Sequence, residues 1–455
     1  MKYTASKQAI EEWGERVAEG VKRITQRLGA EVGKEGRTLE WFEQQVMHAM
    51  KETGQTLLAG VCELHREQYV ASEMRCGCGK VAEYQRKRAG KTKTLFGEVV
   101  MKRAYYLCDQ CHHGQHPLDE QLEFNAGGIS GGLYELMALM GAEFVFDEAA
   151  SMLEKLTLVH VSANSCRKAA ETLGALVTAD EEKNLAAAWD RKAAQLPAVS
   201  DPIAGDFYIS MDGVTVHLEE QGWKNQWLGA IYTTKATVSE KRPDVLEVRM
   251  QQASFYADLG DTKTFGAQVW VEAQRRGMAQ AKRLIVIGDG AHWIWSLADE
   301  HFPGAIQIVD WYHASAYVWQ AAHALYGEGT DLAKHWAKQH LDLLWAGQVA
   351  TVITRLEATS SHKSPVQNAL TYFRNHQQRM RYDLYRAQGL QIGSGTIESG
   401  CKHVIAARLK QAGMIWSAQG ARSVAKLRTR LKSRRWHQTI ALHTYSPRSY
   451  QRFAA

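Results

Sequence analysis

The chain has 455 residues, of which 45% are hydrophobic and 23% charged, and it contains no low-complexity tract. These values exclude a low-complexity protein and predict a globular chain of two to four domains. The first residues lack the apolar core of a signal peptide, and no apolar run reaches the ~18 residues needed to span a bilayer. We therefore expect an intracellular protein with no membrane partner.

Positive charge is concentrated in two blocks, although the formal net charge is only +6. After Glu398 the chain carries twelve Lys or Arg and no Asp or Glu. A second block, residues 80–103, has eight Lys or Arg against two acids. Clustered positive charge of this kind is typical of proteins that bind a polyanion. A solvated basic surface without a partner is the alternative.

Residues 1–70 show helical periodicity, with apolar positions such as Ile10, Trp13 and Val17 recurring every three to four residues. A break over residues 29–36 separates this segment from a second predicted helix, residues 38–65, with Thr38 as its N-cap. The sequence predicts a helical N-terminal arm. It does not decide whether this arm serves dimerisation or DNA contact.

Residues 71–117 contain two cysteine pairs, Cys76 with Cys78 and Cys108 with Cys111. Four thiolates close a tetrahedral site, so the pattern predicts a structural Zn²⁺ rather than a catalytic one. Between the pairs, residues 88–93 read as a turn and the following segment as a strand. We therefore expect a zinc-binding β-hairpin domain, with the basic residues Lys102 and Arg103 on its second strand.

Residues 118–313 divide into two regions of different character. Residues 118–200 are predicted to be helical, and the helices at 147–156 and 162–177, joined by a short connector, outline a helix-turn-helix. An ordinary helical hairpin is the alternative. Residues 201–313 show the order β-β-β-α-β-α-β, which favours a mixed sheet with helices on both faces.

The last part of the chain begins with a polar, helical segment. We expect residues 314–390 to be an all-helical insertion, because no strand pattern interrupts them. Residues 391–436 would complete the domain that begins at residue 201, and residues 437–455 form a basic tail.

Carboxylates follow the apolar strands of the 201–313 region. Asp212 and Asp289 are each followed by a glycine, and Asp310 ends a third strand. Ligands bind open sheets at such edges, and clustered carboxylates suit hard cations such as Mg²⁺. Glu398, near the start of a later helix, is the candidate third acid. Turn or helix capping is the alternative for each residue.

The stretch "GDGAHW" partly matches a dinucleotide-binding loop. Trp293 occupies the position of the third glycine, which close helix–strand packing requires. The sequence therefore disfavours a dinucleotide site at this position.

The set Asp212, Asp289 and Glu398 on this strand order resembles the DDE transposases. The helical interruption before the last acid, and the Asp310-x-x-His313 pair in "DWYH", resemble the Mutator-like branch. Together with "GEVVMKRAYYLCDQC", "MDG" and "SGTIESGCKHVI", they resemble the ISKra-type transposases of bacterial insertion sequences. The resemblance extends from about residue 70 to residue 435.

The resemblance implies a multidomain α+β protein with a ribonuclease H-like mixed α/β catalytic core carrying an all-helical insertion, preceded by helical and zinc-ribbon-like N-terminal domains. It implies that Asp212, Asp289 and Glu398 hold two Mg²⁺ or Mn²⁺ ions, that His313 assists catalysis beside them, and that the enzyme cuts element ends and joins them to target DNA. The resemblance also implies that the protein binds double-stranded DNA and assembles as a homo-oligomer of at least two copies. It implies a location in the bacterial cytoplasm, near the nucleoid. The residues expected to contact DNA are basic: Lys102, Arg103, Arg167, Lys168, Lys402, Arg408, Lys410, Arg428, Arg430, Arg434 and Arg435.

Two other functions are compatible with these residues. One is a zinc-dependent DNA-binding protein without catalysis, and the other is a structure-specific nuclease of the same fold.

Overall fold

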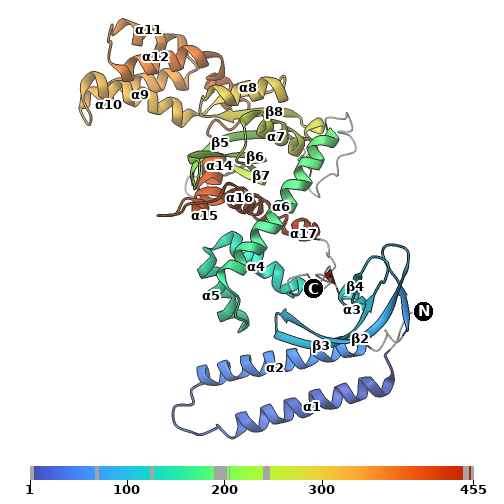
Figure 1. Ribbon diagram of the computed structural model, residues 1–455. Coiled ribbons are helices and arrows are strands. Elements are labelled where there is room, and N and C mark those ends of the chain that lie inside the picture. The colour runs from blue at the N-terminus through green and yellow to red at the C-terminus, as the bar shows by residue number, and fades with distance from the viewer. Residues whose placement is uncertain are drawn as a thin grey trace. The chain divides into compact units, whose positions relative to one another are not determined.

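Two five-stranded sheets organise the chain, and helices lie before, between and after their strands (Figure 1). The computed structural model describes residues 5–66, 71–122, 128–188, 202–203, 205–238, 246–443 and 450–451. It divides into one unit of Met1–Ala170 with His443–Ala455 and a second unit of Glu171–Leu442. The predicted multidomain α+β class is confirmed. No helix within the described ranges is both long and apolar enough to cross a membrane.

The predicted N-terminal arm is a pair of antiparallel helices, α1 (Lys7–Gly29) and α2 (Leu39–Arg66) (Figure 1). Ser6 caps α1 by accepting a hydrogen bond from the Ala9 N–H at 3.1 Å, which satisfies one of the free donors of the first turn. Trp13 lies on Gly60 of α2, where a side-chain carbon would come within 2.1 Å of the indole nitrogen. This glycine therefore permits the close contact between the two helices.

The sheet of the first unit has the order β1-β2-β3-β4-β10. Cys62 of α2 packs with Val99, Met101 and Leu118 in a small core on this sheet. The strands and the helix that follows β4 are β1 (Glu73–Arg75), β2 (Val81–Thr94), β3 (Gly97–Leu107), β4 (His113–Gln115), α3 (Pro117–Gln121) and β10 (Tyr450–Gln451).

The turn predicted at residues 88–93 is wrong, because these residues lie inside β2 and the hairpin turns after Thr94. Gly90 is required for packing instead. A side-chain carbon on Gly90 would lie 2.0 Å from the guanidinium of Arg103. The glycine leaves room for that buried cation and does not mark a reversal of the chain.

Three helices follow the first sheet: α4 (Gly131–Glu143), α5 (Phe146–Thr157) and α6 (Ala163–Ala187). Ser162 accepts a hydrogen bond from the Ser165 N–H at 3.1 Å and so caps α6. Leu158 ends α5 in a left-handed conformation with φ 57°. The two helices of the proposed helix-turn-helix are therefore present, whereas a DNA-reading role stays a prediction.

The sheet of the second unit has the order β7-β6-β5-β8-β9. β5, β6 and β7 pair antiparallel, whereas β5, β8 and β9 pair parallel. The predicted order β-β-β-α-β-α-β is therefore present. Its elements are β5 (Asp206–Leu218), β6 (Gly222–Val238), β7 (Leu246–Asp258), α7 (Thr262–Arg275), η3 (Met278–Gln280), β8 (Arg283–Gly288), α8 (His292–His301) and β9 (Ile306–Val309).

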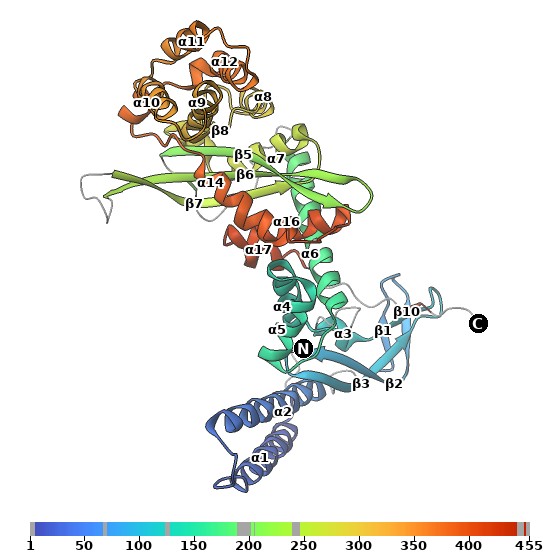
Figure 2. The same cartoon turned by 90° about the vertical axis from the view of Figure 1, so that its left-hand side faces the viewer.

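Helices cover both faces of this sheet (Figure 2). Gly229 of β6 lies against Val269 of α7, while its neighbour Leu228 lies against Gly400. Successive strand residues point to opposite faces, so α7 and the segment around Gly400 cover different sides. These helices bury the apolar strands β5, β6 and β8.

The segment expected to be a helical insertion is helical, and it leaves and rejoins the sheet at one point. Trp311 N donates to Ile392 O at 2.9 Å. The helices between these residues are α9 (Trp311–Tyr326), α10 (Asp331–Trp345), α11 (Val349–Ala358), α12 (Ser364–His376), η4 (Gln377–Arg379) and α13 (Tyr382–Ala387). The later elements are α14 (Gly395–Gly400), the π-helix η5 (Cys401–Ala406), α15 (Ala407–Leu409), α16 (Ala418–Lys432) and α17 (Trp436–Ile440).

Candidate active site and candidate metal centre

Three aspartates form a row across neighbouring strands of the second sheet. β5 and β8 pair in parallel up to Ser210 opposite Ile287. Two residues further on, Asp212 therefore faces Asp289. β8 and β9 pair up to Gly288 opposite Val309, so one residue further on Asp289 faces Asp310. The carboxyl ends of parallel strands are the edge at which open sheets bind ligands.

Asp212 does not end its strand, contrary to the prediction, because β5 continues to Leu218 in its pairing with β6. Only the parallel part of the sheet ends near it. Gly213 is likewise no turn residue: a side-chain carbon there would meet the ring of Trp227 at 2.8 Å. Burial raises the pKa of Asp212, and the nearby charge of Asp289 raises it further, against the hydrogen bonds from Gly213 and Cys401.

Asp289 stands directly after β8, as predicted. Its Oδ1 accepts from the Ala291 N–H at 2.8 Å, and its carbonyl accepts from the Tyr372 hydroxyl at 2.7 Å. Gly290 has a φ of 105°, which favours glycine, and the Tyr372 ring fills the space where its side chain would be. The sequence did not indicate Tyr372, because it lies in the helical insertion, 83 residues away.

Asp310 is buried and both of its carboxylate oxygens accept hydrogen bonds from backbone N–H groups. Oδ1 accepts from His313 at 2.7 Å, which caps α9, and Oδ2 accepts from Ser394. Asp310 therefore joins the end of β9 to the loop that leads into α14. It positions other residues of the site.

Glu398 lies in the short helix α14, as predicted, and its carboxylate has two neighbours. The Ser394 hydroxyl donates to Glu398 Oε1 at 3.0 Å. His313 Nε2 is 3.8 Å from the same oxygen, and both side chains are about half exposed, at 45% and 52%. An imidazole and a carboxylate that face solvent together can hold a cation or contact an anionic substrate.

Cys401 connects the segment of Glu398 to Asp212. Its thiol, three residues after Glu398, donates to Asp212 Oδ2 at 3.4 Å. Burial and the charge of Asp212 raise the pKa of this thiol, so it stays protonated as a donor. Cys401 begins the π-helix η5, a feature frequent at functional sites. The sequence offered no signal for this role beyond the proximity of Cys401 to Glu398.

Among the described residues, two groups have possible ligand atoms that all lie within 4.8 Å of one another. One consists of Asp310, His313 and Glu398, and the other of the four paired cysteines. The predicted set Asp212, Asp289 and Glu398 is therefore not preformed as one tight group. Register brings the two aspartates together, and Cys401 brings the Glu398 segment to Asp212.

The four cysteines lie together as predicted. Cys76 Sγ is 3.5 Å from Cys111 Sγ, and Cys78 Sγ is 3.7 Å from Cys108 Sγ. Four sulfurs at Zn–S distances of about 2.3 Å would be about 3.8 Å apart in a tetrahedron, so the spacing fits. Hydrogen bonding from the backbone of Cys111 lowers the pKa of Cys108 to about 7, which favours its thiolate. Against a backbone hydrogen bond from His113, the side chain of Cys76 and burial raise the pKa of Cys111 to about 12, so the four thiols do not all ionise without a cation.

Five of the eleven residues predicted to contact DNA have side chains that are buried inside their own unit. Arg103 pairs with Asp119 at 3.0 Å, Arg430 with Glu181 at 3.0 Å, and Arg435 with Glu272 at 2.6 Å. The buried group is Arg103, Arg408, Arg428, Arg430 and Arg435. The exposed group is Lys102, Arg167, Lys168, Lys402, Lys410 and Arg434.

Arg408 and Arg428 also contact groups of their own unit. The Arg408 guanidinium lies 4.9 Å from the centre of the Trp416 ring, and Arg428 donates to the carbonyls of His403 and Val404 at 2.5 Å. A buried guanidinium with partners of this kind holds neighbouring segments of its own unit together. Contact of these residues with phosphate stays a prediction.

A family model matches residues 32–438 and is described as an uncharacterised protein family (UPF0236). The chain belongs to UPF0236. The UPF0236 match includes the four cysteines, the row of aspartates and Glu398, whereas α1 precedes it. No curated protein matches the chain.

Proposed function

We propose that the protein is a DNA transposase with a ribonuclease H-like catalytic domain, which cuts the ends of an insertion sequence and joins them to target DNA. The observation that carries the proposal is the row formed by Asp212 and Asp289 on parallel strands, with the Glu398 segment bound to it through Cys401. The mixed sheet, with three antiparallel strands continuing into two parallel ones, supports the proposed fold.

The donor set fits a hard divalent cation. Asp212, Asp289 and Glu398 offer carboxylate oxygens, which Mg²⁺ and Mn²⁺ prefer. The raised pKa of Asp212 reflects burial and the adjacent Asp289 charge, the arrangement in which a bound cation is most stabilising. When bound, Mg²⁺ or Mn²⁺ would activate a water molecule or a 3′-hydroxyl of the DNA as the nucleophile and would stabilise the leaving oxygen.

The remaining residues have supporting roles in this proposal. Ser394 holds Glu398 by a hydrogen bond, and Asp310 holds Ser394 and the start of α9. His313, half exposed beside Glu398, would donate a hydrogen bond to the scissile phosphate. The exposed Lys402 and Lys410 follow in the same segment and would contact DNA phosphates.

The zinc-bound cysteine site would be structural, since four thiolates leave no open position. Exposed cations along β2, including Arg86, Lys87 and Lys91, and Lys102 on β3 give the same domain a basic surface. Such a surface supports contacts to the DNA ends.

The test is cleavage and joining of duplexes made from the DNA that flanks the gene, with Mg²⁺ or Mn²⁺ added. Asp289→Asn is expected to reduce cleavage to the background level. Asp331→Asn is the matched control, because Asp331 is fully exposed on α10. Equal cleavage by wild type and Asp289→Asn would disprove the site assignment. Cleavage without joining would favour a nuclease, and metal-independent binding without cleavage would favour a DNA-binding protein.

A further inference from the structure

Glu398 lies beside a histidine and a second acid that are not among the three proposed catalytic acids. One possible ligand atom from each of Asp310, His313 and Glu398 lies within 4.8 Å of the other two. Within the described ranges, no group of that closeness joins Glu398 to Asp212 and Asp289. The carboxylate of Glu398 therefore belongs to a different set of possible ligands, which we call the Asp310–His313–Glu398 group.

The buried carboxylates of this protein have cationic partners, with one exception. Among the described residues five Asp or Glu side chains are buried, and Asp119, Glu181, Asp258 and Glu272 each form an ion pair with Arg or Lys. The fifth, Asp310, is 0% exposed and in the described part of the chain accepts hydrogen bonds from two backbone N–H groups alone. A buried charge is stable when it is paired or coordinates a metal, so a cation is the partner that Asp310 lacks.

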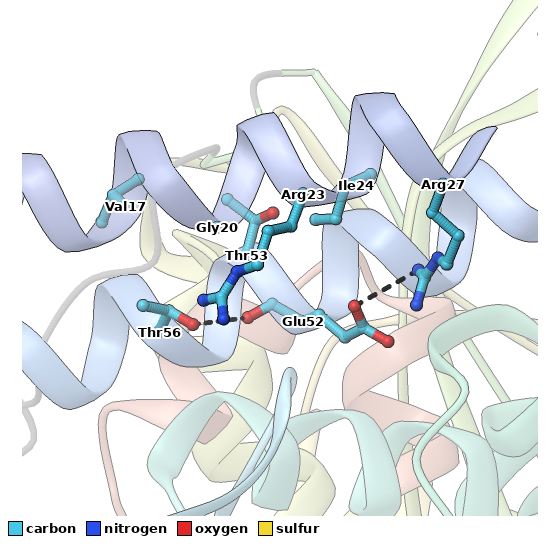
Figure 3. A pocket seen from close by; sticks show the side chains of 8 residues that line it. All are labelled: Val17, Gly20, Arg23, Ile24, Arg27, Glu52, Thr53 and Thr56. Carbon is cyan, nitrogen blue, oxygen red and sulfur yellow. Dashed lines mark hydrogen bonds and ion pairs between the residues drawn. The ribbon is translucent and has the colours of Figure 1, made fainter. Parts of the chain in front are cut away.

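Glu398 is in the same situation, although it is half exposed. Elsewhere an exposed acid beside a cavity has an arginine: Glu52 lies 3.4 Å from Arg27, next to an open cavity of about 300 Å³. Figure 3 shows Arg27 on α1 reaching toward Glu52 on α2. Within the described residues, the ion-pair neighbour of Glu398 is instead His313, which is charged only when protonated. The two acids of the group thus share one imidazole, and a divalent cation would balance them.

The separation of the side chains fits a single ion. Zn²⁺ binds carboxylate oxygen and imidazole nitrogen at about 2.0–2.2 Å, so two such ligands lie about 3.4 Å apart in a tetrahedron. His313 Nε2 and Glu398 Oε1 are 3.8 Å apart and both side chains are half exposed, so small rotations bring them to that distance. Each oxygen of Asp310 keeps a second lone pair beside its backbone hydrogen bond.

Asp310 also holds the other two residues of the group in position. Its Oδ1 caps α9, the helix whose first turn carries His313. Its Oδ2 accepts from the Ser394 N–H, and the Ser394 hydroxyl donates to Glu398 at 3.0 Å. Supporting hydrogen bonds of this kind orient the ligands of metal sites. The group is therefore arranged in advance of any ion.

The donor types select zinc over magnesium. Imidazole nitrogen is a ligand that Zn²⁺ binds well, whereas Mg²⁺ prefers six oxygens. Three protein ligands leave the fourth position of a tetrahedral site open, and the half-exposed His313 and Glu398 leave it open toward solvent. Asp212 and Asp289 offer oxygen alone. The two neighbouring sites therefore prefer different ions and share Glu398.

We propose that the Asp310–His313–Glu398 group binds one Zn²⁺ ion, besides the zinc expected at the four cysteines, and that this ion holds Glu398 away from Asp212 and Asp289. The binding of zinc stands on the geometry of the group. Its consequence, inhibition of DNA cleavage by Zn²⁺, rests on the proposed function.

The first test counts zinc ions per chain in the full-length protein, by elemental analysis after dialysis against Zn²⁺ at low micromolar concentration. Wild type is expected to hold two ions. His313→Gln and Glu398→Gln, with unchanged circular dichroism, are expected to bind the second ion about 10–100-fold more weakly. Asp212→Asn with Asp289→Asn keeps both ions, because neither aspartate is a ligand. His335→Gln is the matched control, since His335 is an exposed histidine of α10.

A single zinc in wild type, or a second ion bound equally well by His313→Gln, would overturn the proposal. Loss of the second ion from the double aspartate variant would also overturn it, because the ion would then belong to the row of aspartates. If a glutamine variant loses its fold, the other one decides, and zinc must raise the Tm of wild type more than that of the variant.

The second test measures DNA cleavage at constant Mg²⁺ and increasing Zn²⁺. Wild type is expected to lose half of its activity at the Zn²⁺ concentration that half-fills the second site. His313→Gln, relative to its own rate without zinc, is expected to need at least about tenfold more Zn²⁺. Zinc binding without inhibition would overturn the withdrawal of Glu398. If wild type cleaves no DNA with Mg²⁺ alone, the proposed function fails, while the zinc count still confirms or overturns the site.

Discussion

Replacing Asp310 by Asn tests how the candidate site is held together. The side chain is fully buried, and its two oxygens accept from His313 N and Ser394 N. Asn keeps the shape, but its amide group cannot accept from the N–H that faces it. One charge-assisted hydrogen bond is worth about 1.5–3 kcal/mol, and the other weakens when the charge is lost. The free energy of unfolding of the Glu171–Leu442 unit is therefore expected to fall by about 3 kcal/mol.

The assay is thermal unfolding, with hydrogen exchange of the His313 and Ser394 amides as a local readout. A unit of this size loses about 2–4 °C in Tm per kcal/mol, so the expected decrease is about 6–12 °C. Exchange at both amides is expected to accelerate, while Asp331→Asn, at the start of α10, leaves Tm unchanged. A loss below about 1 kcal/mol would refute the described role, because removing an acceptor from a buried N–H costs more than that.

Three further predictions concern other parts of the structure. Cys108→Ser is expected to abolish binding of one zinc per chain, measured by elemental analysis, whereas Cys62→Ser retains it because Cys62 is outside the four-cysteine group. Gly290→Ala is expected to cost about 2–4 kcal/mol in denaturant unfolding, since the left-handed φ of 105° and the Tyr372 ring at 2.6 Å both oppose a side chain. A cost below about 1 kcal/mol would contradict this packing. Burial lowers the pKa of His376 to about 4, below the ~6.5 of an unfolded chain. The unfolded state then binds more protons, so stability is complete above about pH 6.5 and is lost, by up to about 3 kcal/mol, as pH falls toward 4. His376→Phe should flatten that part of the stability profile, and an unchanged profile would exclude His376 as its cause.

The strand order and the cysteine cluster were predictable from the sequence because their signals are local. Apolar β-branched runs mark β5 and β8, and the two cysteine pairs flank one hairpin. The continuation of β5 beyond Asp212 was not predictable. It depends on the length of β6 as a pairing partner, which the residues around Asp212 do not encode.

The burial of basic residues in the C-terminal helices could not be predicted from the sequence either. A run of Lys and Arg without local acids indicates a solvated or DNA-binding surface. Arg430 instead pairs with Glu181, which lies 249 residues away on α6. Only the tertiary structure reveals such a partner, so charge patterning overestimated the basic surface of α16.

The hydrogen bond from Trp311 N to Ile392 O closes the base of the helical insertion, so the length of the insertion can vary without moving the site. The chain makes an excursion of about eighty residues and returns to its starting point, so lengthening or shortening α10 and α11 leaves Glu398 where it is. The hydroxyls of Tyr372, Tyr382 and Tyr385 donate to carbonyls of Asp289, Val309 and Gln307. We therefore expect changes of sequence and length to be tolerated at the far end of the helical insertion. They are opposed at its base, where α12 and α13 hold the strands that carry the carboxylates.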